Sequence, residues 1–306
     1  MKGIEEPVER LGSADEAERI YAAEDIGYAN LPEGVLPLLK QLSKERSLAV
    51  REAIFAALQS IRDDAVIGGA IGLLSSDDPF LRNQAVELLR RRGARVIPPL
   101  LQAFPQGDGD ERKLMLDVLA GVDSECSSEI YALALADTDV NVVITAVESL
   151  GNARKTEFRE RVEGLAASPQ PMLAGACLET LAQIGDAHSL EVVRAGASAT
   201  SDLLLPSYLR LLGALGGAGD LAEVAELLGS RGAHLEAPIL DAMTLLRQRH
   251  PSARLPEAAA EPLEHLVRQG SSPILRHQAL RLLEELANHG SVAAFPASWR
   301  PEDERV

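Results

Sequence analysis

The chain has 306 residues, of which 46% are apolar but only 3% aromatic, and its formal net charge is -16. The excess of acidic residues argues against a nucleic-acid partner, because affinity for phosphates depends largely on Lys and Arg. The core must be built from Leu, Ala, Val and Ile, a mixture that favours closely packed helices over sheets. We therefore expect an all-α protein.

The ends and the cysteines of the chain indicate where it works. Cys126 and Cys177 show no C-x-x-C spacing, which disfavours a disulfide framework or a zinc site and fits a reducing compartment. The first thirty residues hold no apolar run suited to a signal peptide, and no stretch approaches the about 20 apolar residues of a membrane span. We expect a cytoplasmic protein without a cofactor, a metal ion or a membrane contact.

A nine-residue helical pattern recurs along the chain. VREAIFAAL at 50–58 returns as LRNQAVELL at 81–89, VVITAVESL at 142–150, LAGACLETL at 173–181 and LRHQALRLL at 275–283. The central residues of these and of weaker copies lie about 31 residues apart until the spacing widens near the end. They are Ala22, Ile54, Ala85, Met115, Ala146, Cys177, Tyr208, Ala242 and Ala279. This period is typical of helical solenoids.

Each repeat divides into a short apolar first helix, as at 35–42, 66–74 and 96–104, and a longer second helix. Acidic turns between them supply N-cap acceptors, and Gly93, Gly151, Gly185 and Gly216 are predicted left-handed C-caps. We expect about nine helix pairs in a right-handed superhelix that forms one solenoid over residues 1–294. Residues 295–306 form a predicted tail whose Phe295 and Trp299 fold back onto the last pair.

The turns DDPFLR at 77–82 and DTDVNV at 137–142 resemble the short HEAT-like repeat of phycobilisome lyases and of many bacterial HEAT-repeat proteins. The resemblance covers nearly the whole chain and implies a fold, not a function. In that family a turn Asp and the following Arg commonly form a ladder between repeats. The resemblance implies this structural role for Arg51, Arg82, Asp77 and Asp137. Arg112 and Arg276 also fit the Arg position, whereas Val143, Ala174 and Leu205 depart from it and interrupt the ladder.

No catalytic motif emerges from the sequence. The His-Glu dipeptides of deoxyhypusine hydroxylase are missing, and the HEAT-like DNA glycosylases need a basic, aromatic-bearing surface that an acidic chain does not offer. The six histidines show neither H-x-x-x-H nor H-E-x-x-H spacing. We expect a protein that is not an enzyme, and a bilin-lyase-like or chaperone-like subunit acting on a chromophore-bearing protein stays open as the alternative.

Charge placement on the second helices suggests a binding surface. The seventh position of the nine-residue pattern is acidic in four consecutive repeats, at Glu87, Asp117, Glu148 and Glu179. In HEAT-like stacks the second helices line the concave face, so these acids form a predicted stripe for a basic segment. The apolar sixth position beside it would supply affinity, through Val86, Leu116, Val147 and Leu178. The alternative is an ordinary solvated helix face.

A run of arginines supplies the second candidate surface, at Arg90, Arg91, Arg92 and Arg95. Cations at the end of a helix complement its macrodipole, which is one explanation, and contact with an anionic partner is the other. Taken together, the sequence favours a non-catalytic scaffold or adaptor that binds a protein or peptide with a basic segment.

Overall fold

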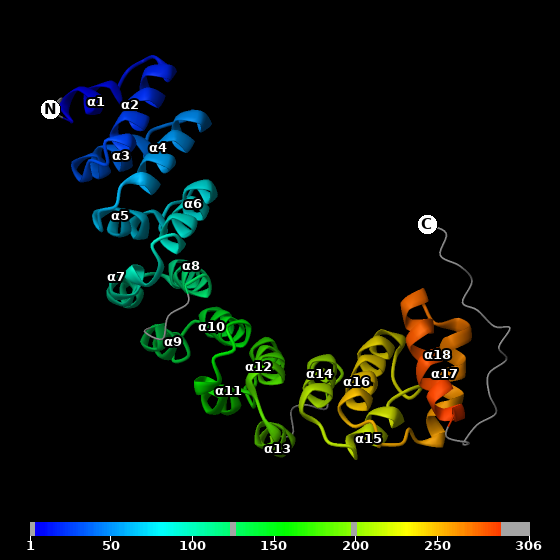
Figure 1. Ribbon diagram of the computed structural model, residues 1–306. Helices are drawn as coiled ribbons and strands as arrows, with labels where there is room; N and C mark the ends of the chain where they lie inside the picture. Colours follow the sequence, from blue (N-terminus) through cyan, green and yellow to red (C-terminus); the bar gives the residue numbers. More distant parts are fainter. Residues whose placement is uncertain (1–3, 123–126, 197–200, 289–306) are drawn as a thin grey trace. The chain divides into compact units, whose positions relative to one another are not determined.

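The computed structural model describes residues 4–122, 127–196 and 201–288 (Figure 1). Within these ranges the secondary structure is helical and no strand occurs, so the prediction of an all-α solenoid is confirmed. Contacts divide the chain into two compact units, Met1–Ser149 and Leu150–Val306, called unit 1 and unit 2. No helix in the described ranges is long and apolar enough to cross a membrane. Cys126 and the predicted tail lie outside the described residues.

The described α-helices number eighteen and form nine consecutive pairs. The first five pairs are α1 (Glu5–Arg10) with α2 (Glu16–Tyr28), α3 (Val35–Leu42) with α4 (Leu48–Ser60), α5 (Ala65–Leu73) with α6 (Pro79–Arg90), α7 (Ile97–Ala103) with α8 (Gly109–Ala120), and α9 (Ser128–Ala134) with α10 (Val140–Asn152). The last residues of α10 cross into unit 2.

Unit 2 continues with four pairs, α11 (Arg159–Leu165) with α12 (Pro171–Ile184), α13 (Ala187–Ala195) with α14 (Leu205–Leu215), α15 (Asp220–Glu226) with α16 (Glu236–Arg249), and α17 (Ala260–Gln269) with α18 (Pro273–Asn288). Short 3-10 turns precede or follow several helices, at Pro32–Gly34, Gly93–Val96, Phe104–Gln106, Thr156–Phe158, Ala233–Leu235 and Glu257–Ala259.

The core follows the predicted register. All nine predicted central residues lie on second helices and are buried, from Ala22 and Ile54, both fully buried, to Tyr208, which is 7% exposed. Small residues let these helices approach closely, because a side chain at the crossing would separate them. A Cβ added to Gly27 on α2 would lie 2.6 Å from the Cα of Ala57 on α4. The helix-pair layers of each unit can be followed in Figure 1, where even-numbered and odd-numbered helices of unit 1 form separate rows.

Turn carboxylates and hydroxyls cap the second helices α2, α4, α6 and α8 as predicted, whereas α12, α14 and α16 begin without a side-chain cap. Asp15 accepts from the amide of Ala17, and Asp78 accepts from the amide of Phe80 at 2.8 Å. The glycine C-cap prediction is correct only at Gly93, which has a φ of 58°. Gly151 lies inside α10, and the left-handed position after that helix is Arg154, with a φ of 54°. Gly185 and Gly216 have extended instead of left-handed backbone, so the helices before them end by a change directly to β-type conformation.

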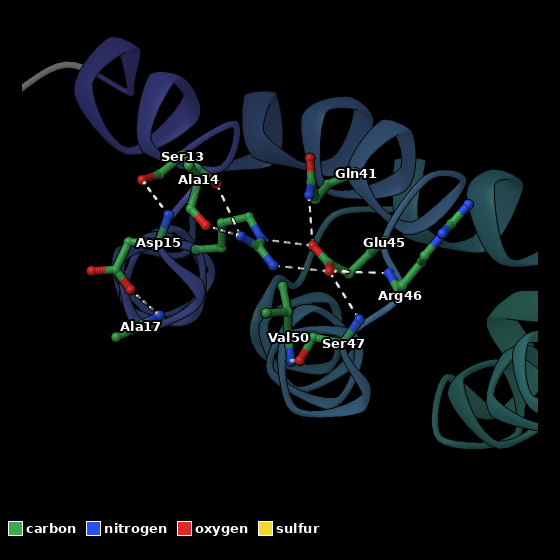
Figure 2. A network of polar contacts seen from close by, with 10 residues as sticks. Ser13, Ala14, Asp15, Ala17, Gln41, Glu45, Arg46, Ser47 and Val50 are labelled. Atoms are coloured by element: carbon green, nitrogen blue, oxygen red, sulfur yellow. Dashed lines mark hydrogen bonds and ion pairs between the residues drawn. The ribbon is translucent and has the colours of Figure 1, made fainter.

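Arginine–carboxylate pairs join successive repeats of unit 1. Arg19 of α2 reaches Glu45, in the turn before α4, with Nε–Oε2 and Nη2–Oε1 distances of 2.8 and 3.2 Å (Figure 2). The Glu45 carboxylate also accepts from the Gln41 side chain and from the Ser47 amide. Burial alone would raise the pKa of Glu45, but these donors outweigh it and lower the pKa to about 2.

The same link recurs further along unit 1, and it corrects one predicted residue. Arg51 pairs with Asp78 at 2.6 Å and stacks over Phe80, with its guanidinium carbon 4.4 Å from the ring centre. Asp78 therefore fills the role predicted for Asp77, whose side chain is exposed, because Asp78 is the N-cap residue that faces the preceding repeat. Arg112 and Asp137 pair as predicted, with an Nε–Oδ2 distance of 2.7 Å.

Arg82 departs from the inter-repeat pattern, because its Nη1 donates to the carbonyl of Ser76 in the turn before its own helix. Arg276 does the same with Gly270. In unit 2 first helices also supply such links, where Arg159 of α11 pairs with Asp186, and Arg194 of α13 pairs with Asp220. Second helices of unit 2 are joined as well, by Arg210 with Glu179 and by Arg247 with Glu285. The links between repeats thus continue in unit 2 through both layers of helices.

Candidate protein-binding groove of unit 1

An open groove of about 500 Å³ crosses three repeats of unit 1. Its walls come from the turn after α5, from α8 and the turn before it, and from Arg82 of α6 and Thr145 of α10. Five carboxylates and two cations line it: Asp77, Asp108, Asp110, Glu111, Asp117, Arg82 and Lys113. The groove therefore has an excess of negative charge, so its chemistry suits a cationic ligand.

The N-terminus of α8 holds two of these acids in fixed positions. Asp108 accepts from the amide of Glu111 at 2.9 Å, and the Glu111 side chain accepts from the amide of Asp108 at 3.1 Å. This reciprocal capping box satisfies amides that the first helical turn would otherwise leave without acceptors. The two carboxylates therefore cap the helix as well as line the groove.

One further pair of opposite charges lies on the same turn of α8. Asp110 and Lys113 form an ion pair at 2.7 Å. The hydrogen bond from Lys113 lowers the pKa of Asp110, and the same bond raises the pKa of Lys113. Because Asp110 is exposed and Lys113 is partly exposed, a ligand cation competes with Lys113 for Asp110 at little energetic cost.

Asp117 differs from the other acids of the groove. Its carboxylate makes no hydrogen bond or ion pair with any described residue, and the nearby Arg90 donates to the backbone carbonyl of Asp117 instead, at 2.9 and 3.2 Å. The side chain is open to solvent, yet surrounding groups remove enough water to raise its pKa. Arg90 and Lys113 act against this rise only through space. Asp117 is thus a carboxylate that has cations nearby but no direct hydrogen-bond or ion-pair partner among the described residues.

The other members of the predicted acidic stripe have different surroundings. Glu87 is exposed on α6 and pairs with Arg90 at 2.7 Å, and Glu148 is exposed on α10. Glu179 lies in unit 2, where its carboxylate accepts from Ser207 at 3.1 Å and pairs with Arg210 at 3.3 Å. The seventh position is therefore accessible as predicted, but only Asp117 of the four lines the groove.

The predicted apolar row beside these acids is wrong as a binding surface. Val86 and Leu116 are 7% and 0% exposed, and Val147 and Leu178 are 0% and 2% exposed. The sixth position contacts the neighbouring repeat because the stacked helices bury a stripe wide enough to include it. These side chains belong to the core and can offer no area to a ligand.

The arginines of this run mainly donate to backbone carbonyls near the C-terminal ends of neighbouring helices. Arg92 donates to the carbonyl of Leu58 near the end of α4 at 2.6 Å, and Arg90 donates to that of Asp117 on α8. Arg95 pairs with Asp64, while Arg91 is exposed. Burial lowers the pKa of Arg92, opposed weakly by Asp64. The helix-end explanation therefore holds for Arg90 and Arg92, although the helices concerned are neighbours and not their own.

Four charged groove residues were not predicted from the sequence, namely Asp108, Asp110, Glu111 and Lys113. The signal was present, because the D-x-x-E spacing of 108–111 is that of a capping box at the start of a helix. What sequence could not give is the position of the turn after α5 against α8, which places Asp77 in the same groove. Within the described residues, no three or more His, Cys, Asp and Glu side chains are grouped to hold a metal ion.

Comparison with known proteins identifies the repeat. Residues 4–90 match the family model of HEAT repeats. No curated protein matches the chain. Among solved structures, the chain is similar to an engineered protein, with 18% identity, 95% of this chain and 90% of the other covered, and a TM-score of 0.47.

A second similar structure is the complex of CpcE and CpcF of phycocyanin lyase from Nostoc sp. PCC7120, with 18% identity, 81% and 95% of the two chains covered, and a TM-score of 0.33. The matched segment comprises the first repeats of unit 1, and the described helices after it keep the same pairing and register. Residues 4–90 are therefore HEAT repeats, and the helix pairs that follow them have the same helix-pair organisation.

Proposed function

We propose that this protein is a non-catalytic scaffold whose unit 1 groove binds a protein segment bearing Lys or Arg. The observation that carries the proposal is Asp117, a carboxylate with a raised pKa and no donor among the described residues, in a groove with four other acids. A ligand cation beside Asp117 would supply the missing direct partner. A cytoplasmic location is part of the same proposal.

The form of the groove supports a segment of chain over a small molecule. It is open, and it extends over three repeats, so an extended or helical peptide can lie across α6, α8 and α10. HEAT-like solenoids present such surfaces because each repeat adds one more helix to the same face. Since the flanking sixth-position side chains are buried, affinity has to come from charge and hydrogen bonds.

The test uses a defined probe, a labelled peptide of about 12 residues with Lys or Arg at every third position among Ala. We expect it to bind the wild-type protein at low salt and to weaken steeply as salt rises, because screening acts over about 8 Å at physiological ionic strength. Asp117→Asn should weaken binding roughly 5- to 30-fold, or about 1–2 kcal/mol, because exposure to solvent reduces the value of a charge-assisted hydrogen bond.

The matched control is Glu52→Gln. Glu52 is an exposed acid of α4 outside the groove, so the control removes the same unit of charge from the protein without changing the site. Equal weakening by both variants would mean that only net charge matters, and the groove would lose its role. Transfer of a bilin to an acceptor protein by the wild-type chain would instead favour the lyase-like alternative.

A further inference from the structure

The first helices of unit 1 form a surface of unusual composition. The helices α3, α5, α7 and α9 are consecutive neighbours, and they form one row in Figure 1. α5 (AVIGGAIGL) and α7 (IPPLLQA) contain no charged residue. We call the solvent-exposed side of these four helices the first-helix face of unit 1.

The face exposes apolar groups and few charges. Leu36 of α3 is 60% exposed and Leu133 of α9 is 43% exposed, while Pro98 of α7 and the α5 glycines Gly68 and Gly72 are also open to solvent. The corresponding first helices of unit 2 carry exposed charges, at Arg161, Glu191, Glu223 and Glu261. Charge is thus usual in this layer of the protein, and unit 1 lacks it on α5 and α7.

The two charged residues of the face lie on its outermost helices and have opposite signs. Lys40 is exposed near the end of α3, and Glu129 is exposed near the start of α9. Neither forms an ion pair with another described residue. A two-fold axis between α5 and α7 places α3 of one copy opposite α9 of the other copy. Lys40 of each copy would then meet the edge of the face that holds Glu129 of the other copy.

The relief of the face suits the same arrangement. Nothing lies within 4 Å of a Cβ added to Gly68 or Gly72, so the α5 backbone is open to solvent at these positions. The axis places α7 of one copy over α5 of the other, where Pro98 and its neighbours can approach the α5 backbone closely. Exposed side chains on α7 and side-chain-free backbone on α5 therefore occur on one patch, as a self-complementary contact requires.

The area is adequate for the apolar centre of an interface. At 1.5 Å per residue and a helix spacing of about 8–10 Å, four such helices side by side cover roughly 400 Å². A standard interface buries about 800 Å² per partner, made of an apolar centre and a polar rim. The rim is present here in Lys40, Glu129 and the pair of Arg95 with Asp64.

We propose that the first-helix face of unit 1 is a self-association surface, on which a second copy of this chain docks about a two-fold axis. For a chain with a net charge of -16, a nearly uncharged face is where two copies can meet without opposing like charges. Self-association therefore strengthens as salt rises, because screening reduces repulsion between the acidic remainders. Peptide binding in the groove has the opposite salt dependence. A failure of the self-association proposal can therefore be distinguished from a failure of the peptide-binding proposal.

The first test measures mass by sedimentation equilibrium over a range of protein concentrations. The wild-type chain is expected to approach twice its 32.7 kDa monomer mass. Gly68→Glu places a charge at the centre of the face without a clash and should weaken the dimer at least about 10-fold. Its matched control is Gly164→Glu on α11, an exposed glycine of a unit 2 first helix whose added Cβ also meets nothing within 4 Å.

The second test exchanges the two rim charges. Lys40→Glu or Glu129→Lys alone should weaken the dimer roughly 2- to 30-fold, because each contact occurs twice in a two-fold dimer. The double variant Lys40→Glu, Glu129→Lys should recover wild-type association. A wild-type chain that stays monomeric at all concentrations and salts overturns the proposal, as does a dimer that Gly68→Glu and Gly164→Glu affect equally. A dimer that the double exchange fails to restore overturns the two-fold geometry.

Discussion

Glu45 offers the sharpest test of how the repeats of unit 1 are joined. Its side chain is only 4% exposed, and Arg19, Gln41 and Ser47 all donate to it (Figure 2). Glu45→Gln keeps the size of the side chain but removes its charge, so charge-assisted hydrogen bonds become neutral ones or lose an acceptor. We expect α2 and α4 to be joined less tightly in this variant.

The size of the effect follows from linkage. Lowering the pKa of Glu45 from 4.5 to about 2 corresponds to about 3 kcal/mol at neutral pH as an upper limit. Partial access of solvent to the network reduces this to about 1–2 kcal/mol. Because the folded-state pKa is depressed, this stabilisation is complete above about pH 4.5 and is lost as the pH falls towards 2.

The assay is urea unfolding of the wild-type and Glu45→Gln proteins at pH 7 and near pH 3, read by circular dichroism at 222 nm. Hydrogen exchange of the α2 and α4 amides locates the loss in unit 1. We expect a difference of about 1–2 kcal/mol at pH 7 that shrinks at the lower pH. A difference that is the same at both pH values, or none at pH 7, would refute the charged network as the link.

Four further predictions follow from particular residues. Gly27→Ala should destabilise unit 1 by about 1–3 kcal/mol in thermal unfolding, because the new methyl meets the Ala57 backbone, despite the better helix propensity of Ala. Ala146→Glu should cost several kcal/mol and lower the melting temperature, since it buries a charge between helices. Cys177, whose pKa burial raises to about 12, should react with a maleimide only after unfolding, as followed by site-resolved mass spectrometry. Asp117→Asn should leave the stability unchanged or slightly higher while it weakens peptide binding. On acidification, peptide binding to the wild-type protein should weaken already at a pH above about 3.9, the usual pKa of Asp, because a carboxyl group with a raised pKa loses its charge earlier.

Periodicity was sufficient to predict the helix pairs and their register, because each second helix buries the same positions in every repeat. Ala85, Ala146 and Ala279 are all fully buried at the predicted centres. Position along a helix does not tell how wide the buried stripe is, so Leu116 was assigned to the surface although it is fully buried. The periodicity also does not give the direction of the backbone in the turn before α6. That direction places Asp78, and not Asp77, next to Arg51.

The groove depends on contacts that no single repeat encodes. Asp117 was predicted from its column, but its lack of a donor results from Arg90 binding the backbone carbonyl of Asp117 instead of the carboxylate. The unit 2 links from Arg159 and Arg194 are not predictable from the repeat pattern for a similar reason, because the pattern marks first helices only by their apolar residues. The role of the tail at 295–306 stays a prediction, as does the single solenoid over residues 1–294.

The central claim is that a basic segment binds in the unit 1 groove, and hydrogen exchange with and without the Lys- and Arg-bearing peptide tests it most directly. The account predicts added protection in α8 and in the turn at 74–77 that disappears in Asp117→Asn. Protection confined to unit 2, or identical protection in wild-type and Asp117→Asn proteins, would contradict it.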